Sequence, residues 1–552
     1  MATRVLAGLT RKNLLSELVT GITLLAIAVP LNIGYAQIAG LPPTAGLYAL
    51  IVPGVLYALV ASSRQVVASP DAAAAALVAS SIGGLAAAGS AGYLTLAFAQ
   101  AILCGVFFVA FSVLKLGFLA NFLSKPILIG FVGGLALDIL VSQVAKMLGV
   151  SIDSGGEFVA KLAQLVTGLP TTNLVALLLS LGSVAVLLGG RRIAPAVPWA
   201  LVVLVSTTVI DVVVGLEQHG VKVLGKVDAG PPSLTWPSLE LGTWIALIPS
   251  ALALTLVTTA EGLLVARSYG EKRHYETTPD RDLMAFGVGN IASGLTGGFT
   301  IGSSTSRTAA LDQAGSRTQL PSIVTAAGTL LLVLFGTALL EHIPNPAIGA
   351  IVAVAVFPLL GIQEFRRLWT QDRGEFTVGA ACFLGAVFLG PIAGIAVAFI
   401  LSLIVLASRA ANPPVDVLSR TGIETGTLTP IGDEERVTAP GLVILRFAAP
   451  VFFANSTELG DQSRRAVRAG GEGATAVQHL VLDLEAVTDV DVTGAENLES
   501  LIGWLHDRGV SLGYSRARPE ILARLDHLGL LEAATLYPTN RAAIEALTRP
   551  DS

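Results

Sequence analysis

Long apolar runs, broken only by short polar stretches, constrain the fold of this chain more than any other feature. The first run, LLSELVTGITLLAIAVPLNIGYAQIAG (14–40), contains one charged residue, Glu17, and similar runs recur as far as residue 409. A helix needs about 20 apolar residues to cross the hydrocarbon core of a bilayer. Charged residues make up 13% of the chain, against about 25% in soluble proteins. Most of the chain is therefore expected to lie in lipid.

The runs predict fourteen membrane spans, of which the third and tenth are unusually short. They fall at 14–40, 44–62, 69–86, 91–115, 123–148, 172–190, 194–215, 243–268, 282–298, 303–314, 318–341, 344–361, 374–389 and 391–409. If the N-terminus is cytoplasmic, the loops on that side should hold most Lys and Arg residues. They do, for example at Arg191–Arg192 and Arg366–Arg367. The even number of spans then places both termini in the cytoplasm.

The two short segments have matching positions in two halves of the membrane region. The stretch ASPDAAAAALVASS (68–81) corresponds in role to GSSTSRTAALDQA (302–314), about 230 residues later in the sequence. With seven spans in each half, an odd number, the second half must be inverted relative to the first. Inverted repeats of this kind are typical of secondary transporters.

Composition changes after the last apolar run and indicates a second domain. We predict a membrane domain at 1–411, a linker at 412–437 and a small α/β domain at 438–552. Strands are expected at LVILRFAAPVFFAN (442–455), HLVLDLEAV (479–487) and VSLGYSR (510–516), and helices at 491–509 and 519–531. The two cysteines, Cys104 and Cys382, lie inside apolar runs and are expected to be core residues.

The stretch GGFTIGSSTSRTAA (297–310) places polar and charged groups among the spans. A charged residue inside a span costs about 2.5–3.5 kcal/mol on insertion scales, so Arg307 is expected to face a cavity or a partner. A helix N-terminus adds about half a positive charge, and Ser69–Pro70 begin the matching segment. Together these features predict an anion site between two half-helix N-termini. The alternative is that small residues merely allow close helix packing, which for Ser303 alone is the better interpretation.

Glu261, in ALTLVTTAEGLLVARSYG, is a second charge expected inside a span. It is a candidate proton carrier, or a sodium ligand together with the hydroxyls of Thr258 or Thr259. The alternative is a structural ion pair with Arg307. Asp138 is a weaker candidate, because it can simply hydrogen-bond a neighbouring helix.

Three separated stretches resemble the SulP anion transporters, whose members include bacterial proteins. They are AVPLNIGYAQIAGLPPTAGLYALIVPGVLYALVASSRQVVASPDAAAAAL, NIASGLTGGFTIGSSTSRTAALDQAGSRTQL and GIQEFRRLW. The C-terminal domain resembles a STAS domain. The resemblance implies a multi-pass protein of the bacterial plasma (inner) membrane, with a 7+7 inverted repeat, core and gate domains and a homodimer contact.

The resemblance also implies which residues bind substrate and which couple transport to an ion. Carried onto matching positions, it points to Glu261 for H⁺ or Na⁺ coupling. The substrate positions that it implies are Tyr35, Ser69, Pro70, Asp71, Ser304, Ser306 and Arg307. Two departures stand out: Leu31 replaces a Gln found in many members, and the DVTG turn of the STAS domain offers Thr493 in place of a phosphorylatable Ser. A helix cap is the simpler role for this turn.

These observations predict a secondary active transporter for a small anion such as sulfate, bicarbonate or a dicarboxylate. The family resemblance implies elevator-type alternating access, and the STAS domain implies a cytoplasmic regulatory protein as a partner. The alternatives are a nucleobase–proton symporter of the same fold, an exchanger or channel without cation coupling, and a non-transporting scaffold. No enzyme signature, cofactor motif, metal site or nucleic-acid-binding pattern is predicted.

Overall fold

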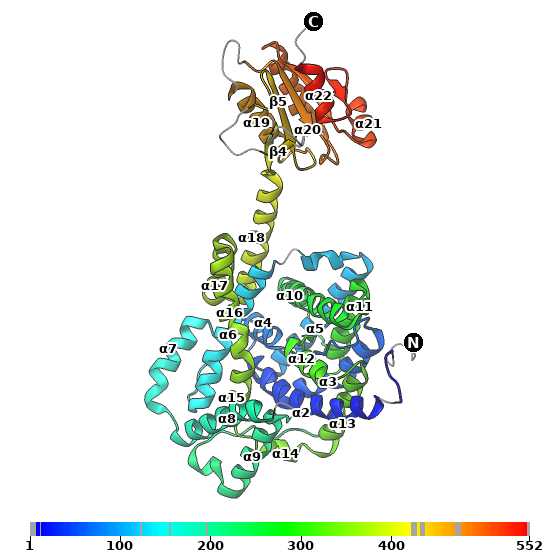
Figure 1. Cartoon of the computed structure of the whole chain (residues 1–552). Coiled ribbons are helices and arrows are strands. Elements are labelled where there is room, and N and C mark those ends of the chain that lie inside the picture. Colours follow the sequence, from blue (N-terminus) through cyan, green and yellow to red (C-terminus); the bar gives the residue numbers. More distant parts are fainter. Residues whose placement is uncertain are drawn as a thin grey trace. The chain divides into compact units, whose positions relative to one another are not determined.

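The computed structural model describes residues 7–11, 13–121, 124–153, 156–194, 197–420, 428–430, 437–469 and 476–548. The chain forms two compact units, Met1–Ser402 and Leu403–Ser552 (Figure 1). Parts of the predicted linker, 421–427 and 431–436, lie outside the described residues.

The first unit is helical, and each of the fourteen predicted spans coincides with a helix. The first repeat contains α2 (Leu14–Ile38), α3 (Pro43–Val60), α4 (Ala72–Ile82), α5 (Ala91–Val113), α6 (Lys125–Leu148), α8 (Leu174–Ile193) and α9 (Trp199–Val214). The second contains α10 (Leu241–Arg273), α11 (Pro279–Leu295), α12 (Thr305–Gln313), α13 (Leu320–Phe335), α15 (Asn345–Val356), α17 (Arg373–Phe388) and α18 (Pro391–Ala411). Within the described residues, seven helical segments are long and apolar enough to cross a bilayer unaided, and one of them, Asn345–Gln371, joins α15 to the helix after it.

Two short helices were not predicted, α7 (Phe158–Gly168) and α16 (Ile362–Gln371), and a third, α14 (Ala338–Glu341), is the end of the predicted span 318–341, separated from α13 by a break in the helix. All three are too short to span a membrane, and α16 has charged residues on its exposed face. A hydropathy criterion for spans does not detect such helices, because they are stabilised by packing one amphipathic side against neighbouring helices.

Helix packing separates the unit into a core and a gate. In the core, α11 packs along α5 and α3, and α13 packs on α2 and α3. In the gate, α6 packs against α15 and α17, and α15 against α8. Figure 1 shows α4 and α12 inside the unit, among the longer helices.

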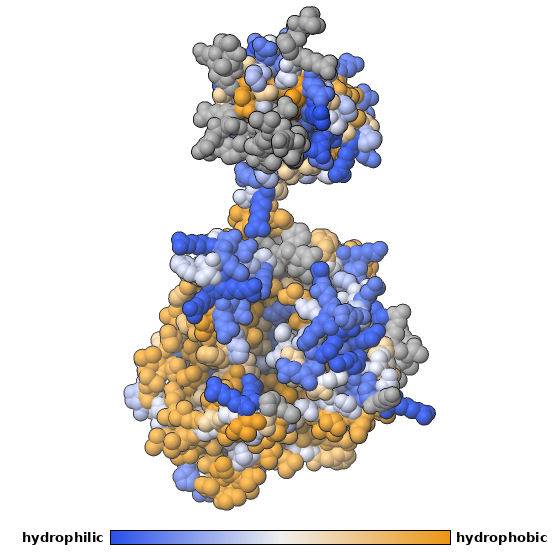
Figure 2. Space-filling view, in the orientation of Figure 1, coloured by the Kyte–Doolittle hydropathy of each residue, from blue (hydrophilic) through white to orange (hydrophobic). Residues whose placement is uncertain are grey.

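Large apolar side chains remain exposed where helices face lipid. Examples on α8 and α9 are Leu174, Leu178, Leu181, Val205 and Val209. Figure 2 shows that hydrophobic residues dominate much of the visible surface of the first unit. A soluble protein would bury residues of this kind, so this surface indicates a membrane environment.

The second unit is an α/β domain around a six-stranded sheet of order β4-β3-β5-β6-β7-β8. Its elements are β3 (Val415–Arg420), β4 (Leu428–Pro430), β5 (Leu442–Phe447), α19 (Ser456–Ala469), β6 (His479–Asp483), α20 (Val492–His506), β7 (Ser511–Ser515), α21 (Pro519–His527), β8 (Thr535–Tyr537) and α22 (Asn540–Leu547). Strands β5 to β8 are parallel, whereas β3 is antiparallel to both of its neighbours.

The stretch predicted as a linker contributes two of these strands, β3 and β4. Val417 pairs with Leu445 of β5, and Leu418 is fully buried. Strands of this kind are stabilised by the strands they pair with rather than by a strong pattern of their own, which explains why composition alone suggested a linker.

Candidate anion-binding site between two half-helices

A two-residue ladder brings the starts of α4 and α12 together from opposite repeats. Strands β1 (Ala68–Ser69) and β2 (Gly302–Ser303) pair antiparallel, with Ala68 opposite Ser303 and Ser69 opposite Gly302. The Ser304 amide extends the ladder by donating to the Val67 carbonyl at 3.0 Å. Two broken segments that are distant in sequence therefore lie side by side.

Each half-helix begins with a side-chain cap that fixes its N-terminus at this ladder. Asp71 Oδ1 accepts a hydrogen bond from the Ala74 amide at 2.7 Å, and Ser304 Oγ accepts from the Arg307 amide at 3.4 Å. Pro70 precedes the first cap and has no N–H of its own to satisfy. Both helix N-termini therefore direct their positive dipole ends toward the same region.

Arg307 supplies the full positive charge, and it is 1% exposed. Its Nη2 donates to the Pro70 carbonyl, so the arginine of one repeat contacts the chain of the other. The guanidinium carbon lies 5.6 Å from the centre of the Tyr35 ring. Its Nε and Nη1 atoms have no hydrogen-bond partner among the described residues. A buried charge with two unused donors is costly unless a ligand completes it.

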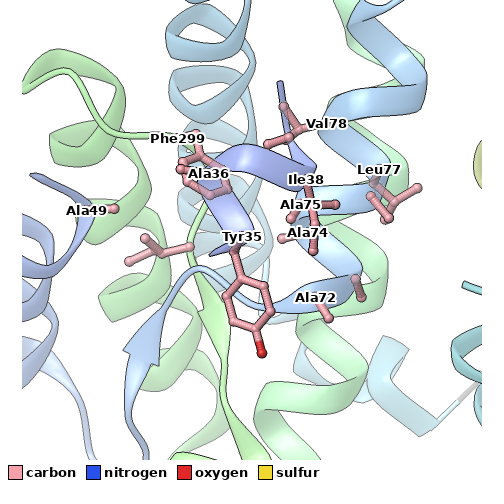
Figure 3. Packing of buried hydrophobic residues seen from close by; sticks show 14 of the residues in the cluster. Tyr35, Ala36, Ile38, Ala49, Ala72, Ala74, Ala75, Leu77, Val78 and Phe299 are labelled. Atoms are coloured by element: carbon pink, nitrogen blue, oxygen red, sulfur yellow. The ribbon is translucent and has the colours of Figure 1, made fainter. Parts of the chain in front are cut away.

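Two buried hydroxyls near Arg307 also lack partners in the described part of the chain, and they belong to Ser69 and Ser303. Figure 3 shows the Tyr35 side chain extending from α2 past the start of α4 at Ala72, with its oxygen pointing away from Phe299. Ser306 is exposed at the first turn of α12. The structure thus brings Tyr35, Ser69 and Arg307 together, whereas the Ser306 side chain is not buried with them.

Gly302 is required for the close approach of the two half-helices. A Cβ atom at this position would collide with Asp71 Oδ2 and would lie 3.4 Å from Thr258 Cγ2. Thr258 belongs to α10, so the eighth span borders the ladder. Glu261 follows one helical turn later and is half-buried.

The predicted alternative of a structural ion pair between Glu261 and Arg307 is not formed. Arg307 has no carboxylate within 4.0 Å in the described residues, and Glu261 has no ion-pair partner there. Thr259 Oγ1, also on α10, is buried without a hydrogen-bond partner in the same set. With both carboxylates ionised, Asp71 and Glu261 would outnumber the single charge of Arg307.

Of two weaker candidates, Asp138 forms an ion pair and Thr493 is not the cap of its helix. Asp138 pairs with Lys161 of α7, with oxygen–nitrogen distances of 2.8 and 3.0 Å. In the STAS-like domain the cap of α20 is Asp491, which accepts from the Gly494 amide at 2.6 Å, while Thr493 is exposed beside it. Cys104 and Cys382 are buried thiols, as predicted.

Sequence reasoning undervalued two residues of the second repeat. The sequence favours a packing role for Ser303, yet its hydroxyl is one of the unpartnered groups. The sequence does not distinguish Thr308, whose hydroxyl accepts a hydrogen bond from the Val67 amide at 3.1 Å, across the repeats. Its position one turn after the Ser304 cap was the available signal. No cluster of three or more His, Cys, Asp or Glu residues suited to a metal lies in the described part of the chain.

Comparisons with known proteins agree with this architecture. A solved structure of murine Solute Carrier 26 family member A9, an anion transporter, superposes with a TM-score of 0.89 at 22% identity, covering 98% of this chain and 93% of that one. The transmembrane domain of BicA, a cyanobacterial bicarbonate transporter, gives a TM-score of 0.60 at 25% identity, covering 72% of this chain and 98% of that one.

Curated relatives are similar over nearly their full length. A protein of Mycobacterium tuberculosis named as a probable sulfate transporter is 32% identical over 542 residues, which are 98% of this chain and 96% of that protein. Low affinity sulfate transporter 3 of Stylosanthes hamata is 30% identical, over 92% of this chain and 83% of that protein. The profile of the sulfate permease family matches residues 14–382, and that of the STAS domain matches residues 435–543. This chain is therefore a multi-pass membrane protein of the sulfate permease (SulP) family with a C-terminal STAS domain.

Proposed function

We propose that this protein is a secondary active transporter that carries a small anion across the bacterial plasma membrane. The observation that carries the proposal is the buried guanidinium of Arg307, which holds two unused donors between two helix N-termini. Preorganised donors with positive potential suit an anion and need no further charge from the protein.

The names of the relatives support a small oxyanion as the substrate. Two relatives are named as sulfate transporters and one solved neighbour as a bicarbonate transporter. The hydroxyls of Ser69 and Ser303, with the donors of Arg307, suit the oxygens of sulfate, bicarbonate or a dicarboxylate. We favour sulfate as the first anion to test.

Charge balance favours coupling to a cation. When ionised, Asp71 offsets Arg307 and Glu261 leaves one negative charge, which opposes an incoming anion. A proton on Glu261, or a sodium ion held by Glu261 with Thr258 or Thr259, would remove that opposition. The anion and the cation would then each increase the affinity for the other, which is the thermodynamic requirement for symport.

The core and gate packing suggests how the site could be exposed to each side in turn. The two half-helices come from opposite repeats, but both belong to the core. They are held together by the pairing of β1 with β2 and by the hydrogen bond from Arg307 to Pro70. We propose that the core moves as a body against the gate, in the elevator manner, with a homodimer formed through the gate and both termini in the cytoplasm. We further propose that the STAS domain binds a cytoplasmic regulatory protein.

Uptake by the purified protein in liposomes tests the proposed function directly. Radiolabelled sulfate, bicarbonate, succinate and uracil are compared, each with and without an imposed pH or sodium gradient. We expect uptake of at least one anion, accumulation against its gradient only when a cation gradient is present, and no uptake of uracil. Uptake of uracil alone would favour the nucleobase symporter. Anion flux without accumulation would favour an exchanger or channel, and the absence of flux for every compound would favour a scaffold.

A further inference from the structure

A cavity that Arg307 does not border lies between the core and the gate of the membrane unit. Its volume is about 450 Å³, and it is bordered by Ala76, Ala79 and Ser80 of α4, by the second half of α6, and by residues from α7, α17 and α18. Ala76, the cavity residue nearest the start of α4, is four residues beyond Ala72, about 6 Å along the helix axis, and none of Ser69, Ser303 and Arg307 borders the cavity. The cavity is thus separate from the site at the half-helix N-termini.

The polar groups of this cavity leave one cation without a carboxylate. Asp138 and Lys161 neutralise each other as an ion pair, and the remaining acid, Glu157, is exposed. Among the described residues, Lys146 donates to one neutral group, Gln37 Oε1, at 3.0 Å. It has no ion pair in the described part of the chain.

Gln143 provides the second observation. This residue borders the cavity one turn before Lys146 on α6, and it is 0% exposed. Neither its Nε2 nor its Oε1 atom has a hydrogen-bond partner among the described residues. A buried amide normally satisfies both atoms, so this one indicates a ligand that accepts a hydrogen bond. Lys146 and Gln143 would meet such a ligand from one helix face.

The remainder of the wall is apolar and determines the kind of ligand. Ile139 of α6, Val387 and Phe388 of α17, and Ala393 of α18 contribute to it. A single inorganic ion would leave this surface and most of the volume unused, whereas cavities of about 300–1,000 Å³ with apolar walls and few polar groups are typical of organic ligands. The occupant should therefore combine an acidic head with an apolar body.

We propose that this cavity is a second anion site, which binds an organic carboxylate whose head contacts Lys146 and Gln143 and whose body lies against α17 and α18. Because α4 belongs to the core and α6 to the gate, an occupant contacts both. A bound carboxylate then holds the core against the gate and inhibits transport; this last step rests on the transport mechanism proposed above, but binding does not.

Binding is measured first, by isothermal titration calorimetry of the full chain in lipid nanodiscs. The probes are hexanoate, hexan-1-ol, which lacks the charge, and acetate, which lacks the body. We expect hexanoate to bind at least tenfold more tightly than either, and Lys146→Met or Gln143→Leu to weaken it about tenfold or more, the loss of one charged hydrogen bond. Lys226→Met is the matched control, because Lys226 is exposed and does not border the cavity.

The same variants separate this site from the first one. Arg307→Ala should leave hexanoate affinity unchanged, and hexanoate should inhibit sulfate uptake by wild-type protein but not by the Lys146→Met variant. The proposal is overturned if neither α6 variant changes hexanoate affinity, if hexan-1-ol binds equally well, or if Arg307→Ala removes hexanoate binding. A protein that binds hexanoate as expected but transports no anion would refute the proposed function alone.

Discussion

Replacing Arg307 by alanine should distinguish the effect of this residue on the stability of the anion-free protein from its effect on anion affinity. The side chain is buried and makes one hydrogen bond to the protein, through Nη2 to Pro70. Its other two donor atoms, Nε and Nη1, have no hydrogen-bond partner among the described residues. A hydrogen bond to a charged group is worth about 1.5–3 kcal/mol, so two of them account for about 3–6 kcal/mol of anion binding. At about 1.4 kcal/mol per tenfold, the variant should bind its anion about 100- to 10,000-fold more weakly.

Although Arg307→Ala should weaken anion binding, it should not lower the stability of the anion-free protein. Arg307→Ala removes a buried guanidinium whose Nε and Nη1 donors are unsatisfied, which offsets the lost bond to Pro70, so the melting temperature without anion should stay the same or rise. Adding anion at 100 times its dissociation constant should stabilise the wild-type protein by about 2.7 kcal/mol and the variant hardly at all.

The assay is thermal unfolding of purified protein, followed by intrinsic fluorescence, with and without sulfate, bicarbonate or succinate. Arg267→Ala serves as the control, because Arg267 is an exposed arginine on α10 paired with Glu271. The reasoning is refuted if Arg307→Ala lowers the anion-free melting temperature by several degrees while the anion-induced shift persists. Arg307 would then be a structural tie between the repeats.

Three further predictions concern neighbouring positions. Ser304→Ala removes the cap of α12 and should cost about 1 kcal/mol of stability, seen as a lower melting temperature, whereas Ser303→Ala should leave that temperature unchanged and weaken anion binding; equal effects of the two would contradict their assigned roles. Glu261→Gln mimics the protonated, cation-free state and should abolish accumulation driven by an ion gradient while sparing anion exchange in liposomes, so continued accumulation would exclude a coupling role. Gly302→Ala places a methyl group against Asp71 Oδ2 and should destabilise the membrane unit by about 1–3 kcal/mol, and a variant with wild-type melting behaviour would show that the ladder can widen.

The membrane helices were predictable because lipid imposes a simple rule on the chain. A segment must be long and apolar and must satisfy its own backbone, so hydropathy locates it. Hydropathy does not locate helices α7 and α16, because they do not have to span the membrane and their apolar residues pack against neighbouring helices. Strand β3 was not predicted, because its stability comes from pairing with β5. In each case the missing information was the identity of a partner.

The same limit explains what was missed in the site. The sequence places hydroxyls at 303, 304 and 308, and nothing in their chemistry distinguishes them. The register of the ladder does, because pairing Ala68 with Ser303 sets Ser304 as the helix cap and brings Thr308 to the Val67 amide. Ser303 is then the hydroxyl with no partner left to bind. Its role as a candidate ligand group follows from the register in which the two repeats pair. That register cannot be read from the sequence of either repeat alone.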